Sequence, residues 1–82
     1  MNLNEKNNLR QLIKRLLQEN GDAGEIADGE SIFISGRLSS FYMMMLVVEL
    51  EKSFGIDFSK VEFVVDLFDT INDIETFLDT EG

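Results

Sequence analysis

Residues 39–48 read Ser-Ser-Phe-Tyr-Met-Met-Met-Leu-Val-Val, and this stretch decides which fold the chain can adopt. The eight residues after the two serines are all apolar or aromatic, so they predict a helix that is apolar around most of its circumference. Such a helix is central and contacts several neighbours. We predict that it spans residues 40–53, with Ser39 as its N-cap, because a serine side chain can accept from a free backbone N–H. It ends at Phe54-Gly55.

Further helices are predicted on both sides of this stretch. Residues 4–19 form an amphipathic helix that Asn20-Gly21 ends, since these residues tolerate the left-handed conformation. Ser59-Lys60-Val61-Glu62 has the capping-box spacing and opens a short third helix. Thr70-Ile71-Asn72-Asp73 has a similar signal, with Asp69 as a competing cap, and opens a last helix to about Asp79. The apolar stripes of the first and last helices comprise Leu9, Leu12, Ile13, Leu16 and Leu17, and Ile71, Ile74, Phe77 and Leu78.

A long connection separates the first two helices. Residues 20–38 contain four glycines, and compact domains rarely keep so long a loop unless it serves a purpose. Its triplet Ile32-Phe33-Ile34 is too short for a sheet, so we expect it to lie against the helices and help close the core. The chain is therefore predicted to be all-α, a single domain over residues 1–82. Its architecture is an irregular antiparallel four-helix bundle with a long first loop and a short third helix.

Composition excludes several classes of function. The chain has no cysteine and no histidine, which excludes disulfides and cysteine nucleophiles and removes the commonest general base. We therefore predict that it is not an enzyme and that it holds no metal. The longest apolar run, residues 41–48, is too short to span a bilayer, and the N-terminus lacks the apolar core of a secretion signal. We expect a cytoplasmic monomer.

Charge is distributed unevenly around a net value of −9. Residues 1–18 carry four bases and one acid, whereas residues 19–82 carry fifteen acids and three bases. An acidic body of this kind repels phosphate backbones, so we predict no nucleic-acid partner. It attracts basic surfaces of other proteins, although a role in solubility is the simpler interpretation of the charge alone.

One segment remains as a candidate site once other motifs are excluded. The chain has no glycine-rich phosphate loop, and Asp66, Asp69 and Asp73 do not form a calcium loop because Ile71 occupies the glycine position. Residues 35–41 lie where the flexible loop meets the central helix. A helix N-terminus favours an anion by ~0.3–1 kcal/mol at an exposed site, and it presents a hydroxyl to a modifying enzyme. From these residues alone, capping of the helix is the simpler interpretation of both serines.

The spacing of three motifs resembles the phosphopantetheine-binding carrier family. Phe54-Gly55-Ile56 stands fourteen residues beyond Ser40, which matches the family's Phe-Gly-Ile and aligns Ser39-Ser40-Phe41 with its Asp-Ser-Leu motif. Residues 68–71 are similar to the turn that opens the family's last helix. The resemblance implies a 4'-phosphopantetheine arm on Ser40 that holds acyl groups as thioesters. It implies as partners a phosphopantetheinyl transferase and acyl-activating or acyl-transferring enzymes.

Departures from the family motif suggest a specialised carrier. Ser39 replaces the family's acid beside the attachment serine, and Tyr42 and Met45 replace acids on the second helix. Such a helix suits a dedicated partner with an apolar groove, in a specialised lipid or polyketide-like pathway. Alternatively, Tyr42 and Met45 belong to the core, where the methionines at 43–45 would provide adaptable packing. The predicted partner contacts are Arg37, Phe41, Tyr42, Met45 and Glu49.

Two other functions stay open. Residues 36–41 and 67–74 are similar to D-alanyl carrier proteins, which favour Phe after the serine, so the cargo could be an aminoacyl group. The chain could also be an unmodified acidic helical adaptor that binds a partner directly through its apolar helix.

Overall fold

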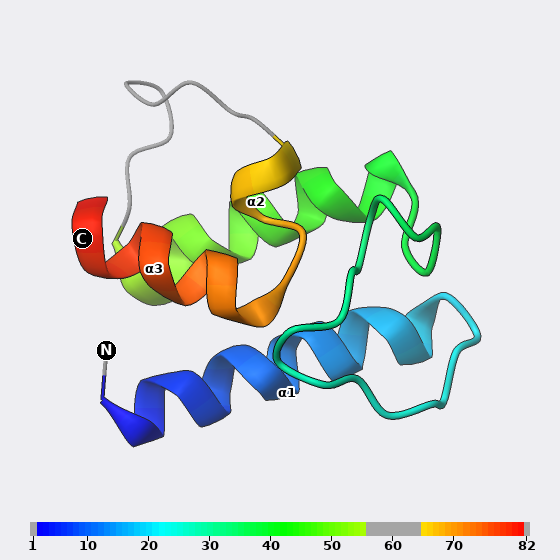
Figure 1. The fold of residues 1–82 in the computed structure, drawn as a ribbon, viewed down its shortest axis with the longest axis horizontal. Coiled ribbons are helices and arrows are strands. Elements are labelled where there is room, and N and C mark those ends of the chain that lie inside the picture. Colours follow the sequence, from blue (N-terminus) through cyan, green and yellow to red (C-terminus); the bar gives the residue numbers. More distant parts are fainter. Residues whose placement is uncertain (1, 56–64, 82) are drawn as a thin grey trace.

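The computed structural model describes residues 2–55 and 65–81, which form helices and loops and no strand. The elements described are α1 (Leu3–Glu19), α2 (Ser40–Phe54), the 3-10 turn η2 (Val65–Leu67) and α3 (Ile71–Glu81). Both α2 and α3 run in the direction opposite to α1 (Figure 1). The all-α prediction is confirmed. The signal at residues 59–62 that is predicted to open a short third helix lies outside the described residues.

The boundaries of α1 follow from local hydrogen bonds. Asn2 is the N-cap, and its side chain accepts a hydrogen bond of 2.8 Å from the N–H of Glu5. At the other end Gly21 has a φ of 82°, and the N–H of Asp22 donates to the carbonyl of Leu17 at 2.8 Å. This is the Schellman arrangement, which requires a left-handed residue just beyond the helix. The predicted end at Asn20-Gly21 is confirmed.

The start of α3 is also set by a side-chain cap. Thr70 Oγ1 accepts a hydrogen bond of 2.9 Å from the N–H of Asp73, as the capping-box spacing predicts. Asp69 does not compete for this role, because its carboxylate is bonded elsewhere. The helix continues to Glu81, two residues beyond the predicted end.

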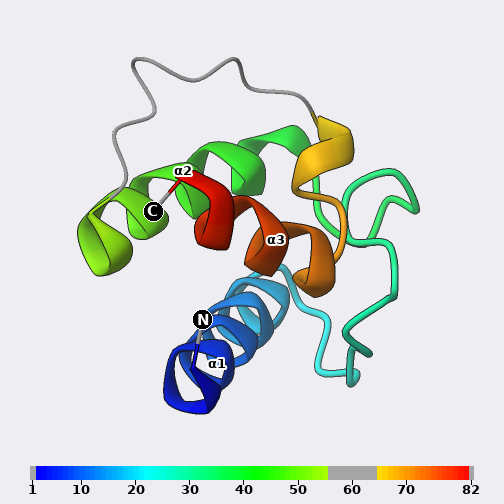
Figure 2. The same ribbon diagram turned by 60° about the vertical axis from the view of Figure 1, so that its left-hand side comes forward.

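The hydrophobic core is built from every described element except η2, and the loop contributes to it. In Figures 1 and 2 α1 lies on one side, with α2 and α3 on the other. All nine apolar residues of the two predicted stripes are buried. The core comprises Leu9, Leu12, Ile13, Leu16, Leu17, Ile32, Leu38, Leu46, Leu50, Phe68, Ile71, Ile74, Phe77 and Leu78.

Helix α2 is less central than its composition predicts. Only Leu46 and Leu50 of this helix are buried, whereas Phe41 is 64% exposed and Met44 is 72% exposed. The continuous apolar run conceals two stripes, one toward the core and one toward solvent, so apolar composition alone overestimates the burial of the helix. The prediction that the three methionines pack in the core is wrong for Met44.

The basic residues of α1 are paired with acids of the same fold. Arg10 Nη2 lies 2.6 Å from Asp28 Oδ2 in the loop, and Lys6 Nζ lies 3.0 Å from Glu75 Oε1 in α3. The hydrogen bond from Arg10 lowers the pKa of Asp28 below its ordinary value. These pairs join α1 to the loop and to α3. In the parts of the chain that the structure describes, no helix is long and apolar enough to cross a membrane.

Candidate functional site

The loop reaches α2 through a compact turn at residues 32–38. The N–H of Gly36 donates to the carbonyl of Phe33, and the N–H of Leu38 donates to the carbonyl of Ile32, both at 3.0 Å. Gly36 has a φ of 86°, a conformation that residues with a Cβ rarely adopt. Ile32 is buried and Phe33 is half-buried, as predicted, but Ile34 is 65% exposed. Ile34 belongs to the turn that the Gly36–Phe33 hydrogen bond closes, and it lies on the solvent side of that turn.

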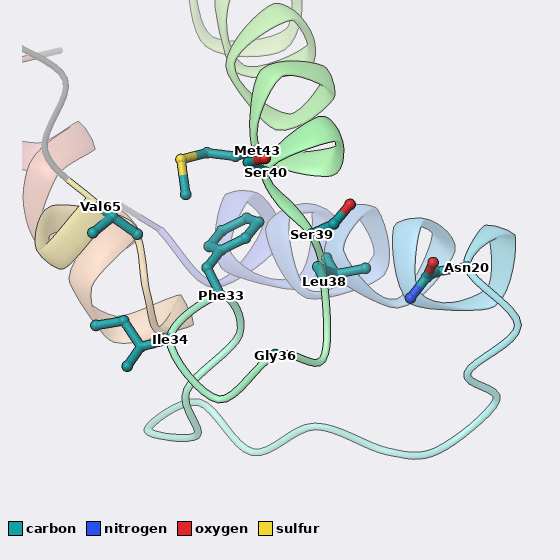
Figure 3. A pocket seen from close by; sticks show the side chains of 9 residues that line it. All are labelled: Asn20, Phe33, Ile34, Gly36, Leu38, Ser39, Ser40, Met43 and Val65. Carbon is teal, nitrogen blue, oxygen red and sulfur yellow. The ribbon is translucent and has the colours of Figure 1, made fainter.

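Ser39 occupies the predicted N-cap position of α2, but its side chain makes no capping hydrogen bond. Its backbone carbonyl accepts a hydrogen bond of 3.1 Å from the N–H of Tyr42, and its hydroxyl is exposed. The hydroxyl points away from Phe33 and Met43 (Figure 3). The prediction that Ser39 is the N-cap residue is therefore confirmed, but the predicted hydrogen bond from the helix to its side chain is not formed. Because the backbone alone starts this helix, removal of the hydroxyl should cost less than the ~1 kcal/mol typical of a lost cap.

Ser40 is the first residue of α2 and is exposed to solvent. Within the described residues, the N–H groups of Ser40 and Phe41 have no hydrogen-bond acceptor. The first turn of the helix contains no acidic side chain. A phosphodiester on the hydroxyl of Ser40 would therefore lie at the positive end of the helix dipole, without a neighbouring carboxylate to repel it. The residues present fit the arm that the resemblance implies.

A pocket of about 570 Å³ opens beside this serine. Its walls come from the turn at residues 32–38, from the start of α2 and from η2 (Figure 3). Most of the lining is apolar, which suits contact with the apolar part of an arm attached at its edge. The lining residues are Asn20, Phe33, Ile34, Gly36, Leu38, Ser39, Ser40, Met43 and Val65.

Arg37 lies within the loop that leads to the two serines, and its charge is paired there. Its side chain is 18% exposed, with Nε 3.1 Å from Asp22 Oδ2 and Nη1 2.7 Å from Glu30 Oε2. Nη1 also donates to the carbonyl of Glu25 at 3.0 Å. The bond from Arg37, followed by that from the N–H of Gly24, lowers the pKa of Asp22. This predicted partner contact thus holds the loop together.

The other predicted contacts on α2 divide between two faces. Phe41 is exposed, whereas Tyr42 and Met45 are half-buried and pack against the core, as the alternative interpretation of these two residues expects. Glu49 is half-buried and lies 3.6 Å from the guanidinium of Arg15. The structure brings Phe41 and Ser40 together at the start of the helix.

Sequence reasoning missed two residues of the exposed face. Met44 and Val48 join Phe41, Met45 and Glu49 around a shallow pocket of about 240 Å³. Positions 41, 44, 45 and 48 have the helical spacing of one face, so a second stripe was present in the sequence. The continuous apolar run hid it. We call Phe41, Met44, Met45 and Val48 the apolar face of α2.

The three aspartates considered for calcium lie in different surroundings. Asp66 is exposed in η2, and the N–H of Asp73 is bonded to the cap of α3. Asp69 binds the loop. Across residues 2–55 and 65–81, no three acidic side chains are placed to hold a metal ion.

Comparison with known proteins identifies the family. A family model described as a phosphopantetheine attachment site matches residues 7–78, which extend from the first turns of α1 into α3. Searches of the curated proteins and of the solved structures found no match. Members of this family carry 4'-phosphopantetheine covalently, and their carrier domains are not catalytic themselves. The resemblance noted in the sequence is confirmed: this chain belongs to the family of carrier proteins with a phosphopantetheine attachment site.

Proposed function

We propose that this protein is an acyl carrier whose phosphopantetheine arm is attached to Ser40. The observation that carries the proposal is the place of the Ser40 hydroxyl, exposed at the start of α2 and at the edge of a largely apolar pocket. The Ser40 hydroxyl oxygen attacks the pantetheine-bearing phosphate of coenzyme A, which breaks the pyrophosphate bond and releases adenosine 3',5'-bisphosphate and the hydroxyl proton. The free N–H groups of the helix stabilise the charge of the phosphodiester that forms. The thiol at the other end of the arm then holds the acyl group as a thioester.

A thiol count tests this function directly, because the chain has no cysteine. The unmodified protein is expected to contain no titratable thiol. After incubation with coenzyme A and a promiscuous phosphopantetheinyl transferase, one thiol per chain should appear in the repurified protein. A count that stays at zero with several transferases would favour the unmodified acidic adaptor.

The partners of the loaded protein are proposed from the apolar face of α2. Phe41 and Met44 are exposed there. Met45, on the same face, stands where the family's fatty-acid carriers present an acid that docks on basic patches. We infer that an acyl-activating or acyl-transferring enzyme with an apolar groove binds this face, in a specialised lipid or polyketide-like pathway. Aromatic side chains and methionine are enriched in the buried centres of protein interfaces. Arg37 and Glu49 are already paired with charges of this chain. We therefore place them at the rim of the proposed interface and not at its centre.

An aminoacyl cargo is a second candidate, favoured by Phe41. This residue follows Ser40 directly and is largely exposed, as expected if it contributes to recognition in the manner of the D-alanyl carriers that share it. The two cargoes are distinguished by offering the loaded protein to a D-alanine-activating enzyme and to a fatty-acyl-activating enzyme. Formation of only one thioester identifies the class.

Ser39→Asp is expected to speed loading by a general transferase. In the family, the aspartate before the attachment serine lies where the phosphopantetheinyl transferase holds coenzyme A and its metal. Ser39 occupies this position and has no carboxylate. Stability should change by no more than a few tenths of a kcal/mol, because the Ser39 hydroxyl makes no capping bond that could be lost. The gain in rate should shrink at high salt, since exposed charges are screened over about 8–10 Å. Equal or slower loading of the variant would mean that the apolar face of α2 determines any selectivity.

A further inference from the structure

We propose that Asp69 is a positioning residue for Ser40, although the two residues lie on different elements. The proposal rests on attachment at Ser40. Asp69, just before α3, holds the turn at residues 32–38 in place, and the position of this turn sets where the Ser40 hydroxyl is presented.

The first step is the convergence of hydrogen bonds on Asp69. Its Oδ1 accepts from the N–H groups of Phe33 and Ile34, both at 2.8 Å, and its Oδ2 accepts from the hydroxyl of Ser31 at 2.6 Å. Its backbone carbonyl accepts from the N–H of Ile32, also at 2.6 Å. One residue thus binds four consecutive residues of a loop that lies 35 to 38 positions away in sequence.

The second step leads from that loop to the attachment serine. The carbonyl of Ile32 accepts from the N–H of Leu38, so the turn closes at the residue two positions before Ser40. Leu38 is buried in the core, which leaves only Ser39 between a fixed residue and the start of α2. The position of Ile32 therefore determines the direction from which the chain enters the helix. Phe33 and Ile34, which Asp69 binds, also line the pocket beside Ser40.

Asp69 is buried and ionised, and its carboxylate has no role in capping α3. Asp69 is 7% exposed, and an ionised carboxylate is buried only when its oxygens are well bonded. Burial alone would raise its pKa, but the bonds from Ser31 and from the N–H groups of Ile34 and Phe33 outweigh burial and leave the pKa below its ordinary value. Thr70, not Asp69, caps α3. The carboxylate of Asp69 therefore binds the loop that leads to Ser40.

Loading kinetics of Asp69 variants test the proposal. The apo-protein is titrated as substrate for a general phosphopantetheinyl transferase with saturating coenzyme A, at a temperature where circular dichroism shows each variant folded. Asp69→Ala removes the three side-chain bonds. Asp69→Asn keeps the shape, since its Oδ1 can accept from both N–H groups and its Nδ2 can donate to Ser31. Asp66→Ala, an exposed acid three residues earlier, is the matched control.

Misplacement of the hydroxyl should lower kcat and leave KM nearly unchanged, because the transferase binds the carrier over a wider surface than the serine. We expect Asp69→Ala to lose about tenfold or more in kcat with KM within about twofold, since a shift of 1 Å can cost about a hundredfold. Asp69→Asn should restore kcat to within about threefold, and Asp66→Ala should match the wild type. A folded Asp69→Ala with wild-type kcat, a change confined to KM, or no rescue by Asp69→Asn would overturn the proposal.

A second variant covers the case in which Asp69→Ala does not fold. Ser31→Ala then takes its place, because it removes one bond to the carboxylate and the bond to the N–H of Ser35. It is expected to lower kcat by about threefold, and a wild-type kcat would overturn the proposal. If the wild-type chain itself cannot be loaded, attachment at Ser40 fails, and this result is distinct from normal loading of the Asp69 variants.

Discussion

Replacing Ser40 by Ala is expected to abolish attachment of phosphopantetheine, whereas Ser39→Ala should still be loaded. The two hydroxyls are neighbours and both are exposed, but only Ser40 lies on the first turn of α2 beside the free N–H groups. Alanine is the best helix former and occupies this position without strain, so Ser40→Ala should fold as the wild type does. Loading is measured as the fraction of chains that gain the mass of one arm.

Ser39→Ala is the matched control, because it removes a hydroxyl one residue away. Its free energy of unfolding should fall by less than ~1 kcal/mol, since the hydroxyl of Ser39 makes no capping bond. If loading were lost in Ser39→Ala and retained in Ser40→Ala, the arm would be attached one residue earlier than we propose.

Phe68→Ala is expected to destabilise the fold more than any change near the serines. Phe68 is fully buried between η2 and α3, and its ring centre lies 4.7 Å from that of Phe77. Truncation of a buried phenylalanine to alanine costs ~3–5 kcal/mol through lost burial and the cavity left behind. A domain of this size has a total stability of about 4–12 kcal/mol, at roughly 0.05–0.15 kcal/mol per residue. The variant should therefore lose a large part of its stability.

The adjacent Leu67 provides the control for this measurement. It is about half exposed, so Leu67→Ala should change the free energy of unfolding by less than ~1 kcal/mol. Urea unfolding followed by circular dichroism measures both variants. Equal losses for Phe68→Ala and Leu67→Ala would contradict the placement of Phe68 in the core.

The sequence predicted the helices well where capping and periodicity agree. In α1 and α3 the apolar residues recur at helical spacing, and residues such as Gly21 and Thr70 mark a boundary. These signals are local, and each depends on residues within one or two turns. For that reason they predict element boundaries without knowledge of the tertiary structure.

The candidate site depended on information that is not local. The resemblance implied Ser40 as the attachment site through its distance from Phe54-Gly55-Ile56, but no pattern revealed that Asp69 binds Phe33 and Ile34. That contact joins segments more than thirty residues apart, and Asp69 resembled a helix cap in the sequence. Likewise, the apolar run of α2 did not show which of its residues face solvent, because that choice depends on how the helix packs.

The Ser39 side chain illustrates a third limit of sequence reasoning. The residue type and the position both favour a cap, yet its hydroxyl makes no bond to the first turn. Serine at an N-cap has a choice of rotamers, and sequence does not say which one it adopts. Because no capping bond is lost, Ser39 can be replaced by aspartate at little cost in stability, and the effect on loading can be measured without unfolding.

The intact mass of the protein after co-expression with a promiscuous phosphopantetheinyl transferase tests the central claim most directly. We predict that the wild type gains the mass of a single 4'-phosphopantetheine group, and that fragmentation places this group on Ser40. Ser40→Ala, expressed in the same way, should keep the mass of the unmodified chain. An unchanged mass of the folded wild type, or an arm on any other residue, would contradict the account.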